Sequence, residues 1–172
     1  DAMVLHNGII YLVGNTTTDD GGTNTYVYAA ALTENGIFVS TSGVTGVKKF
    51  NSGNTDLYKA NDILVDANGK IMIAGLKSFD NLYVMKITTT GALDASWSND
   101  GIAFIPTNNS DHWWDLYDME LDKNGQVLIA GKKYRANNGS TIPAFWNVFV
   151  ARWNANGTLD NTFATNGIGL YN

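Results

Sequence analysis

The 172-residue sequence contains no cysteine and only two prolines, and 16% of its residues are charged. The lack of cysteine excludes disulfides, thiolate metal sites and cysteine nucleophiles. The charged fraction is well below the ~25% of ordinary domains. A net charge of −5 offers no basic surface to nucleic acid or to an anionic membrane. No apolar run approaches the roughly 20 residues of a membrane-spanning helix. From the charge we expect no nucleic-acid partner, and from the lack of long apolar runs we expect no membrane insertion.

Uncharged polar residues are abundant instead, with 21 Asn, 18 Gly and 17 Thr. Asn and Gly favour turns, Thr favours strands, and none of the three favours a helix. No long window has the apolar spacing of a helix. The composition therefore predicts an all-β protein with almost no helix.

The sequence repeats one pattern three times. An Asn-Gly pair between apolar segments occurs at 7–8, 68–69 and 124–125, and a glycine closes the second apolar segment at position 14, 75 or 131. The pairs are 61 and then 56 residues apart. Asn-Gly between apolar segments indicates a hairpin, because a type I′ turn needs positive φ at both central residues. Each unit therefore predicts about four short strands.

Four-stranded units at this spacing are typical of β-propeller blades. We expect one repeat domain over residues 1–172, with blade one at 1–50, blade two at 51–105 and blade three at 106–172. Propellers have about four to eight blades, so this chain is expected to be a partial propeller. Its expected partners are further blades of a longer protein or a second copy that completes a six-bladed ring.

Strand positions are clearest in blade two. The apolar segments there predict strands near 62–66, 70–75, 81–88 and 101–105. In blade one, the segment corresponding to Leu93-Asp94 is missing, which leaves the last strand of that blade uncertain.

The segment from Asp66-Ala67-Asn68-Gly69-Lys70 to Gly75, followed by Leu93-Asp94-Ala95-Ser96-Trp97 and Asp100-Gly101-Ile102, resembles the delta-sixty repeat of bacterial β-propellers. Blade three is similar to the same repeat, and blade one is similar in its first half. The resemblance implies a secreted or surface-exposed bacterial protein. It implies no reaction, because propellers carry many unrelated functions.

Repeated aspartates are the first candidates for chemistry. Asp66 and Asp122 begin segments that look like the start of a calcium loop, but an EF-hand has its glycine at position 6 and a glutamate at position 12. Here the glycine comes two residues early and no glutamate follows. We interpret both aspartates as caps of hairpin turns. Asp94 and Asp160 share another repeat position, which favours a structural turn over catalysis.

No catalytic constellation is visible in the sequence. His6 and His112 are the only histidines and occupy different repeat positions, so neither a histidine metal site nor a catalytic triad is predicted. We expect no catalytic residue, no metal and no other cofactor. His6 precedes an Asn-Gly pair and is expected at the tip of a hairpin.

The most unusual segment comprises His112, Trp113, Trp114 and Asp115, with further acids behind it. Successive side chains of a strand point to opposite faces, so one of the two tryptophans should be at least partly exposed if the segment is extended. An exposed indole beside carboxylates suits a sugar ring and its hydroxyls. We predict a ligand site at these four residues. The alternative is a solvated connector whose tryptophans cover a sheet edge.

Three classes of function remain open from the sequence. The leading one is a non-catalytic binding or adhesion module outside the cell, for a protein or a polysaccharide. The second is a structural spacer in a larger surface protein. The third is a polysaccharide-active enzyme, which would need two carboxylates about 5–10 Å apart in one cleft.

Overall fold

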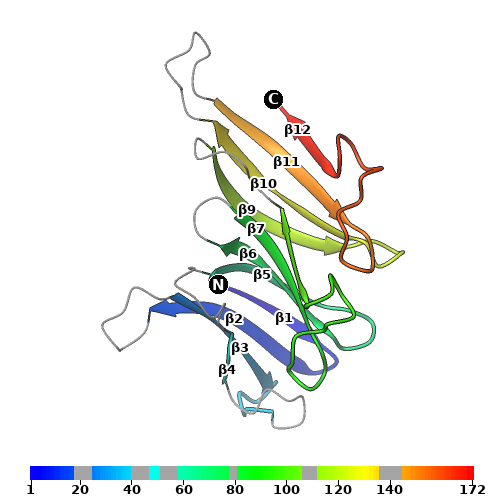
Figure 1. Cartoon of the computed structure of the whole chain (residues 1–172). Coiled ribbons are helices and arrows are strands. Elements are labelled where there is room, and N and C mark those ends of the chain that lie inside the picture. Colours follow the sequence, from blue (N-terminus) through cyan, green and yellow to red (C-terminus); the bar gives the residue numbers. More distant parts are fainter. Residues whose placement is uncertain (18–24, 40–46, 51–57, 78–80, 106–111, 136–144) are drawn as a thin grey trace.

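The computed structural model describes residues 1–17, 25–39, 47–50, 58–77, 81–105, 112–135 and 145–172. Within these residues the chain forms three four-stranded antiparallel sheets and no helix (Figure 1). No helix in this part of the chain could therefore cross a membrane. The predicted all-β fold of four-stranded units is confirmed.

Each sheet consists of four consecutive strands in chain order. The first sheet contains β1 (Ala2–His6), β2 (Ile9–Thr17), β3 (Thr25–Thr33) and β4 (Val47–Phe50). The second contains β5 (Tyr58–Val65), β6 (Ile71–Lys77), β7 (Asn81–Ile87) and β8 (Ile102–Ile105). The third contains β9 (His112–Leu121), β10 (Val127–Arg135), β11 (Phe145–Trp153) and β12 (Ile168–Tyr171).

The strands of the second sheet lie close to their predicted positions, except that β5 begins four residues early, at Tyr58. The reason is a β-bulge between Ala60 and Asp62, which lets the strand continue through polar residues that look like a loop in the sequence. In the first sheet, β4 pairs with β3, so this sheet has a fourth strand although the Leu-Asp segment is missing.

The hairpin turns are of two kinds. Asn7 and Gly8 have φ values of 50° and 76°, as the predicted type I′ turn requires. The same prediction is wrong at Asn68-Gly69 and at Asn124-Gly125, where only the glycines have positive φ. In the first of these turns, Asp66 Oδ1 accepts hydrogen bonds from the amides of Asn68 and Lys70 at 2.8 and 2.9 Å. This cap stabilises a longer turn that ends in the left-handed glycine.

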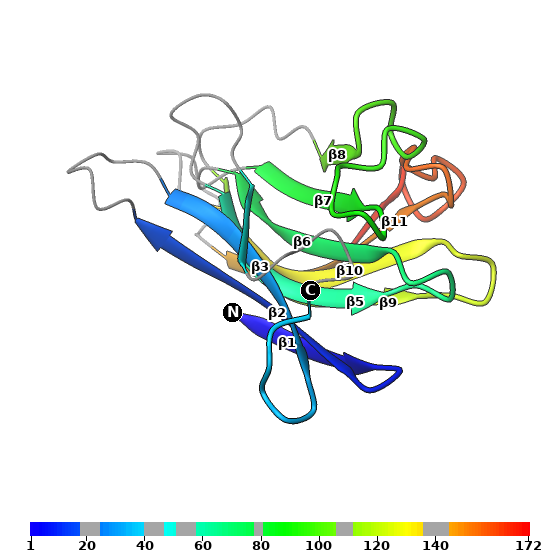
Figure 2. The same ribbon diagram turned by 90° about the horizontal axis from the view of Figure 1, so that it is seen from below.

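The sheets pack face to face, with the second between the first and the third (Figure 1). In both views β5 lies beside β9 and next to strands of the first sheet (Figures 1 and 2). We call the side of a sheet that points toward the next sheet along the chain its forward face, and the opposite side its rear face. One core lies between the first and second sheets and another between the second and third.

Directly paired residues of neighbouring strands point to the same face, so each face can be read as rows across the sheet. One row of the rear face is Ile63, Ile73, Met85 and Ile102 in the second sheet. The corresponding row is Met119, Ile129, Ala151 and Ile168 in the third sheet. Both rows contribute to the cores. Each fully buried Ile or Met side chain contributes about 1.5–3 kcal/mol to the stability of the fold.

The repeated glycine lies within the second strand of each unit and has a steric explanation in the second and third sheets. A Cβ on Gly75 would lie 1.7 Å from the carbonyl oxygen of Lys59, and one on Gly131 would lie 1.9 Å from that of Asp115. Both carbonyls belong to the strand that carries the bulge. The repeated glycine therefore makes room for the bulged strand.

Candidate functional site

The predicted ligand site lies at the start of β9, and its residues do not share one environment. Trp114 is buried, with 4% of its surface exposed, whereas Asp115 is exposed. His112 and Trp113 pair through their backbones with Arg135 and Tyr134, but their side chains lie outside the described residues. The expectation of one partly exposed tryptophan therefore rests on Trp113 and stays a prediction.

Trp114 belongs to the core between the second and third sheets. Its ring meets Phe149 edge to face, with centroids 4.8 Å apart, and Lys133 Nζ lies 4.7 Å from the ring centroid. Its indole N–H is buried, and no described residue accepts a hydrogen bond from it. Trp114 is thus packed in the core and is out of reach of a ligand. Among the described side chains of this group, the one that a ligand can reach is Asp115.

A network of acids and bases links the turns of the second sheet. Lys70 Nζ lies 2.7 Å from Asp94 Oδ2, and Lys86 Nζ lies 2.9 Å from Asp66 Oδ2. Hydrogen bonds from Lys70 and Ser96 lower the pKa of Asp94. Partial burial opposes ionisation of Asp66, but hydrogen bonds from Lys86 and two turn amides outweigh it and lower its pKa.

The third sheet repeats this arrangement with other bases. Arg152 binds Asp160 Oδ2 through two nitrogens, at 2.8 and 2.7 Å, and Gln126 donates to the same oxygen at 3.1 Å. Thr162 Oγ1 donates to Asp160 Oδ1 at 2.6 Å. The pKa of Asp160 is lowered to about 2. The hydrogen bond from the Thr162 hydroxyl is the largest cause, and Arg152 adds to it.

These contacts confirm that the repeated aspartates cap and join turns. Carboxylates with lowered pKa values stay ionised at neutral pH and are poor proton donors, whereas a general acid needs a raised pKa. Asp122 is similar, because the amide of Gln126 lowers its pKa. The repeated acids therefore have a structural explanation in both sheets.

Asp62 differs from the other acids. Burial raises its pKa, although amide hydrogen bonds from Ile63 and Met119 oppose the shift. Those bonds measure 2.8 and 2.7 Å. The second of them crosses from β5 to the third sheet. Asp62 is therefore engaged in the contact between two sheets.

The described residues hold no group of three or more His, Asp or Glu side chains placed to bind a metal ion. His6 lies at the tip of the first hairpin, as predicted, where its ring nitrogen Nε2 is 3.0 Å from the side-chain nitrogen Nδ2 of Asn7.

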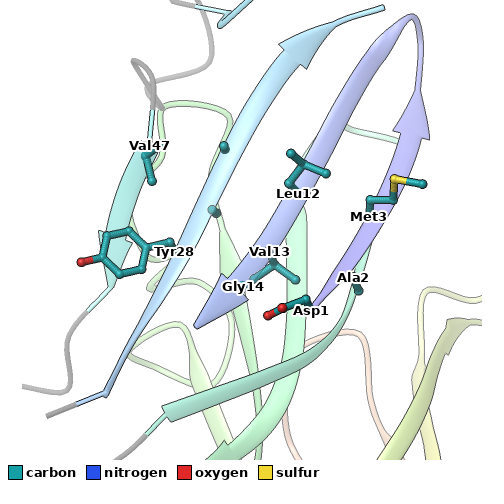
Figure 3. A pocket seen from close by; sticks show the side chains of 10 residues that line it. Asp1, Ala2, Met3, Leu12, Val13, Gly14, Tyr28 and Val47 are labelled. Carbon is teal, nitrogen blue, oxygen red and sulfur yellow. The ribbon is translucent and has the colours of Figure 1, made fainter. Parts of the chain in front are cut away.

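A hollow of about 480 Å³ lies on the first sheet, and apolar side chains line most of it. Met3, Leu12, Tyr28 and Val47 surround it (Figure 3). These residues belong to the rear face, which no other described sheet covers.

Exposed apolar residues gather on the third sheet as well. Tyr117, Trp146, Val148 and Tyr171 are each more than half exposed, and Lys132 Nζ lies 5.4 Å from the Tyr117 ring centroid and 5.7 Å from that of Trp146. This surface was not predicted from the sequence. Its signal was present in the repeat alignment, since Val148 and Tyr171 occupy the positions of the buried Leu82 and Ile105.

One family model matches part of the chain. Residues 123–163 match the model described as a domain of unknown function (DUF5122) beta-propeller. This range begins in the turn before β10 and ends just after Asp160, so it lies within the third sheet and its turns. No curated protein sequence matches the chain. Three packed four-stranded antiparallel sheets, one of which matches a β-propeller model, identify the architecture as that of β-propeller blades.

Proposed function

We propose that this chain is part of a non-catalytic binding or adhesion module that works outside a bacterial cell, on a polysaccharide or a surface protein. The observation that carries the proposal is that the repeated aspartates are engaged in structural contacts within the blades. Asp66, Asp94 and Asp160 are each held by a cation and by turn amides. The repeat thus provides a stable scaffold, and ligand recognition is left to residues that differ between the blades.

Asp115 is the residue through which we propose that a ligand binds, together with His112 and Trp113 as predicted from the sequence. Its repeat equivalent, Lys59, is exposed although both faces of the second sheet are covered. A ligand could therefore reach this position in a complete propeller. An exposed carboxylate accepts hydrogen bonds from sugar hydroxyls or protein amides.

We assign the chain to the delta-sixty repeat propellers as part of this proposal. The repeated Asn-Gly and Leu-Asp segments support it, as does the match of one blade to a β-propeller model. The secreted or surface location follows from that assignment.

The test is a polysaccharide array probed with the intact chain, followed by affinity measurements on any ligand found. Binding to one polysaccharide class is expected, and Asp115→Asn should weaken it about tenfold or more, the effect of losing a charged hydrogen bond. Glu34→Gln, which changes an exposed carboxylate in a turn of the first sheet, is the matched control and should bind normally. Turnover of the polysaccharide would replace the proposal with an enzyme. No binding to any array polysaccharide, and none to extracted surface proteins, would replace it with a structural spacer.

A further inference from the structure

The exposed apolar residues are concentrated at the two ends of the stack of sheets. Every large hydrophobic side chain that is strongly exposed in the described residues, apart from Leu93, belongs to the first or the third sheet or to an adjoining turn. Most of them lie on the rear face of the first sheet or on the forward face of the third. These are the two faces that no described sheet covers.

The two free faces are the two halves of an interface that the chain already forms twice. On the second sheet, the forward row containing Leu76, Leu82 and Ile105 is covered by the third sheet, and these residues are 8%, 0% and 2% exposed. The same row of the third sheet contains Val148 and Tyr171, which are 53% and 54% exposed.

The rear face behaves in the same way. The rear row of the second sheet contains Ile63 and Ile73, which are 4% and 0% exposed in the core against the first sheet. The same row of the first sheet contains Met3 and Val47, which are 73% and 52% exposed. This row borders the hollow in Figure 3. The hollow therefore lies on the rear face of the first sheet. In the second and third sheets, the forward face of the preceding sheet covers this rear face.

Polar groups, like the apolar ones, are paired between described sheets and exposed on the two free faces. Across the second interface, Asp62 accepts a hydrogen bond from the Met119 amide. The residue that corresponds to Asp62 in the third sheet is Asp118, which is exposed, and the residue that corresponds to Met119 in the first sheet is Met3. One free face thus carries the acceptor position and the other carries the donor position.

The turns at the edge of the sheets give an independent indication. The turn of the second sheet that contains Trp97 packs on Gly157 of the third, and Ser98 donates a hydrogen bond of 2.8 Å to Asn156. The glycine corresponding to Gly157 in the first sheet is Gly36, around which a Cβ would meet nothing within 4 Å. Phe163, which corresponds to the buried Trp97, is only half-buried. Both halves of this contact are therefore unused as well.

We propose that two copies of this chain associate head to tail, with the forward face of the third sheet of each copy on the rear face of the first sheet of the other. Such a pair closes a ring of six sheets, which is within the about four to eight blades of known propellers. The contact is heterologous, because it joins two different surfaces, and it occurs twice in the closed pair. Asp118 of each copy then lies at the Met3 amide of the other.

Light scattering coupled to size-exclusion chromatography tests the proposal over a range of concentrations. The wild-type chain is expected as a species of about 37 kDa, twice the 18.6 kDa of one copy. Met3→Glu and Val148→Glu each place a carboxylate in both junctions and should each give monomers. An equimolar mixture of the two variants should recover pairs of about 37 kDa, because one junction is then free of substitutions. Ala67→Glu, in an exposed turn of the second sheet, is the control and should pair normally.

The substituted positions are exposed in the single chain, so circular dichroism should show the same β-sheet spectrum for every variant. Monomers of the wild-type chain at all concentrations, a ladder of open multimers, or pairing that survives in either single variant would each overturn the proposal. A second measurement uses the absence of cysteine from the sequence. A mixture of Asp118→Cys and Met3→Cys should form a disulfide between the two variants under mild oxidation, and its absence from a 37 kDa pair would also overturn the proposed register.

Discussion

The carboxylate of Asp62 in the second sheet accepts a hydrogen bond of 2.7 Å from the backbone amide of Met119 in the third sheet. Both strands that make this contact, β5 and β9, carry a β-bulge. Asn61, the neighbour of Asp62, donates a hydrogen bond of 3.1 Å to the carbonyl of Leu116. Two adjacent polar side chains of β5 therefore connect the second and third sheets. Asn15 has the same role between the first two sheets, where it binds both the N–H and the C=O of Ala60.

Replacing Asp62 by alanine should destabilise the chain. The change leaves the amide of Met119 without its acceptor between two sheets, and an unsatisfied group of this kind costs about 1–3 kcal/mol. Denaturant unfolding followed by tryptophan fluorescence measures the loss. Glu34→Ala removes an exposed carboxylate and should change stability by less than about 0.5 kcal/mol. Equal stability of the two variants would mean that the contact between Asp62 and Met119 contributes nothing.

The bulges also make a prediction about glycine. Gly131→Ala should destabilise the chain by about 3 kcal/mol, the upper part of the range for overpacking, because the new Cβ would lie 1.9 Å from the backbone oxygen of Asp115. Gly14 occupies the same repeat position, but the nearest atom there is a side-chain oxygen of Asp1 at 3.1 Å. Gly14→Ala should therefore cost less than about 1 kcal/mol. Thermal unfolding of both variants compares the two sites, and a similar loss at each would show that backbone crowding is not the cause.

Strand positions could be predicted from the sequence because apolar segments and Asn-Gly pairs are local signals. The three rows of the second sheet that contain Ile73, Ala74 and Leu82 follow directly from them. The contacts between sheets could not be predicted, because Asn61 lies outside the predicted strand and Asp62 is only its first residue. Their partners are 55 and 57 residues away, and the bulge that aims them leaves no sequence pattern of its own.

The candidate site was predictable only in part. The turn roles of Asp66 and Asp160 follow from their repeated positions, since a residue that recurs in each blade serves what the blades share. The burial of Trp114 does not follow, because strand alternation tells that two adjacent tryptophans face opposite ways without telling which one faces the core. That choice depends on the pairing of β9 with β10 and on the neighbouring sheet.

The acid limb of the stability curve should depend on Asp160. Its pKa is lowered from 3.8 to about 2, so the folded chain keeps this carboxylate ionised at pH values where the unfolded chain takes up a proton. The stability that Asp160 contributes is therefore complete above about pH 4 and is lost as the pH falls toward 2. Asp160→Asn should make unfolding less dependent on pH in this window, as measured by denaturant titrations between pH 2 and pH 7.

A pair of threonines provides the control for Asp160. Thr162→Val removes the hydroxyl that lowers the pKa most but keeps the ion pair with Arg152, so the pKa should rise partway toward 3.8, as followed by carboxyl NMR. Thr158 is bonded to Asn154 and Asn156 instead, and Thr158→Val should leave the titration of Asp160 unchanged. An unchanged titration in Thr162→Val would show that the remaining contacts of Asp160, with Arg152 and with the backbone amide of residue 162, set its pKa.

The two neighbouring tryptophans of β9 should respond differently to truncation. Trp114 is 4% exposed and packs edge to face on Phe149, so Trp114→Ala should cost about 3–5 kcal/mol, as for other buried aromatic residues. Trp113→Ala is expected to leave stability nearly unchanged and to weaken ligand binding, if the ligand site at the start of β9 is correct. Asp115→Ala, an exposed neighbour on the same strand, should cost less than about 0.5 kcal/mol. Urea unfolding and array binding of the three variants decide the matter. Large stability losses for both tryptophans would place the whole segment in the core and remove the proposed site.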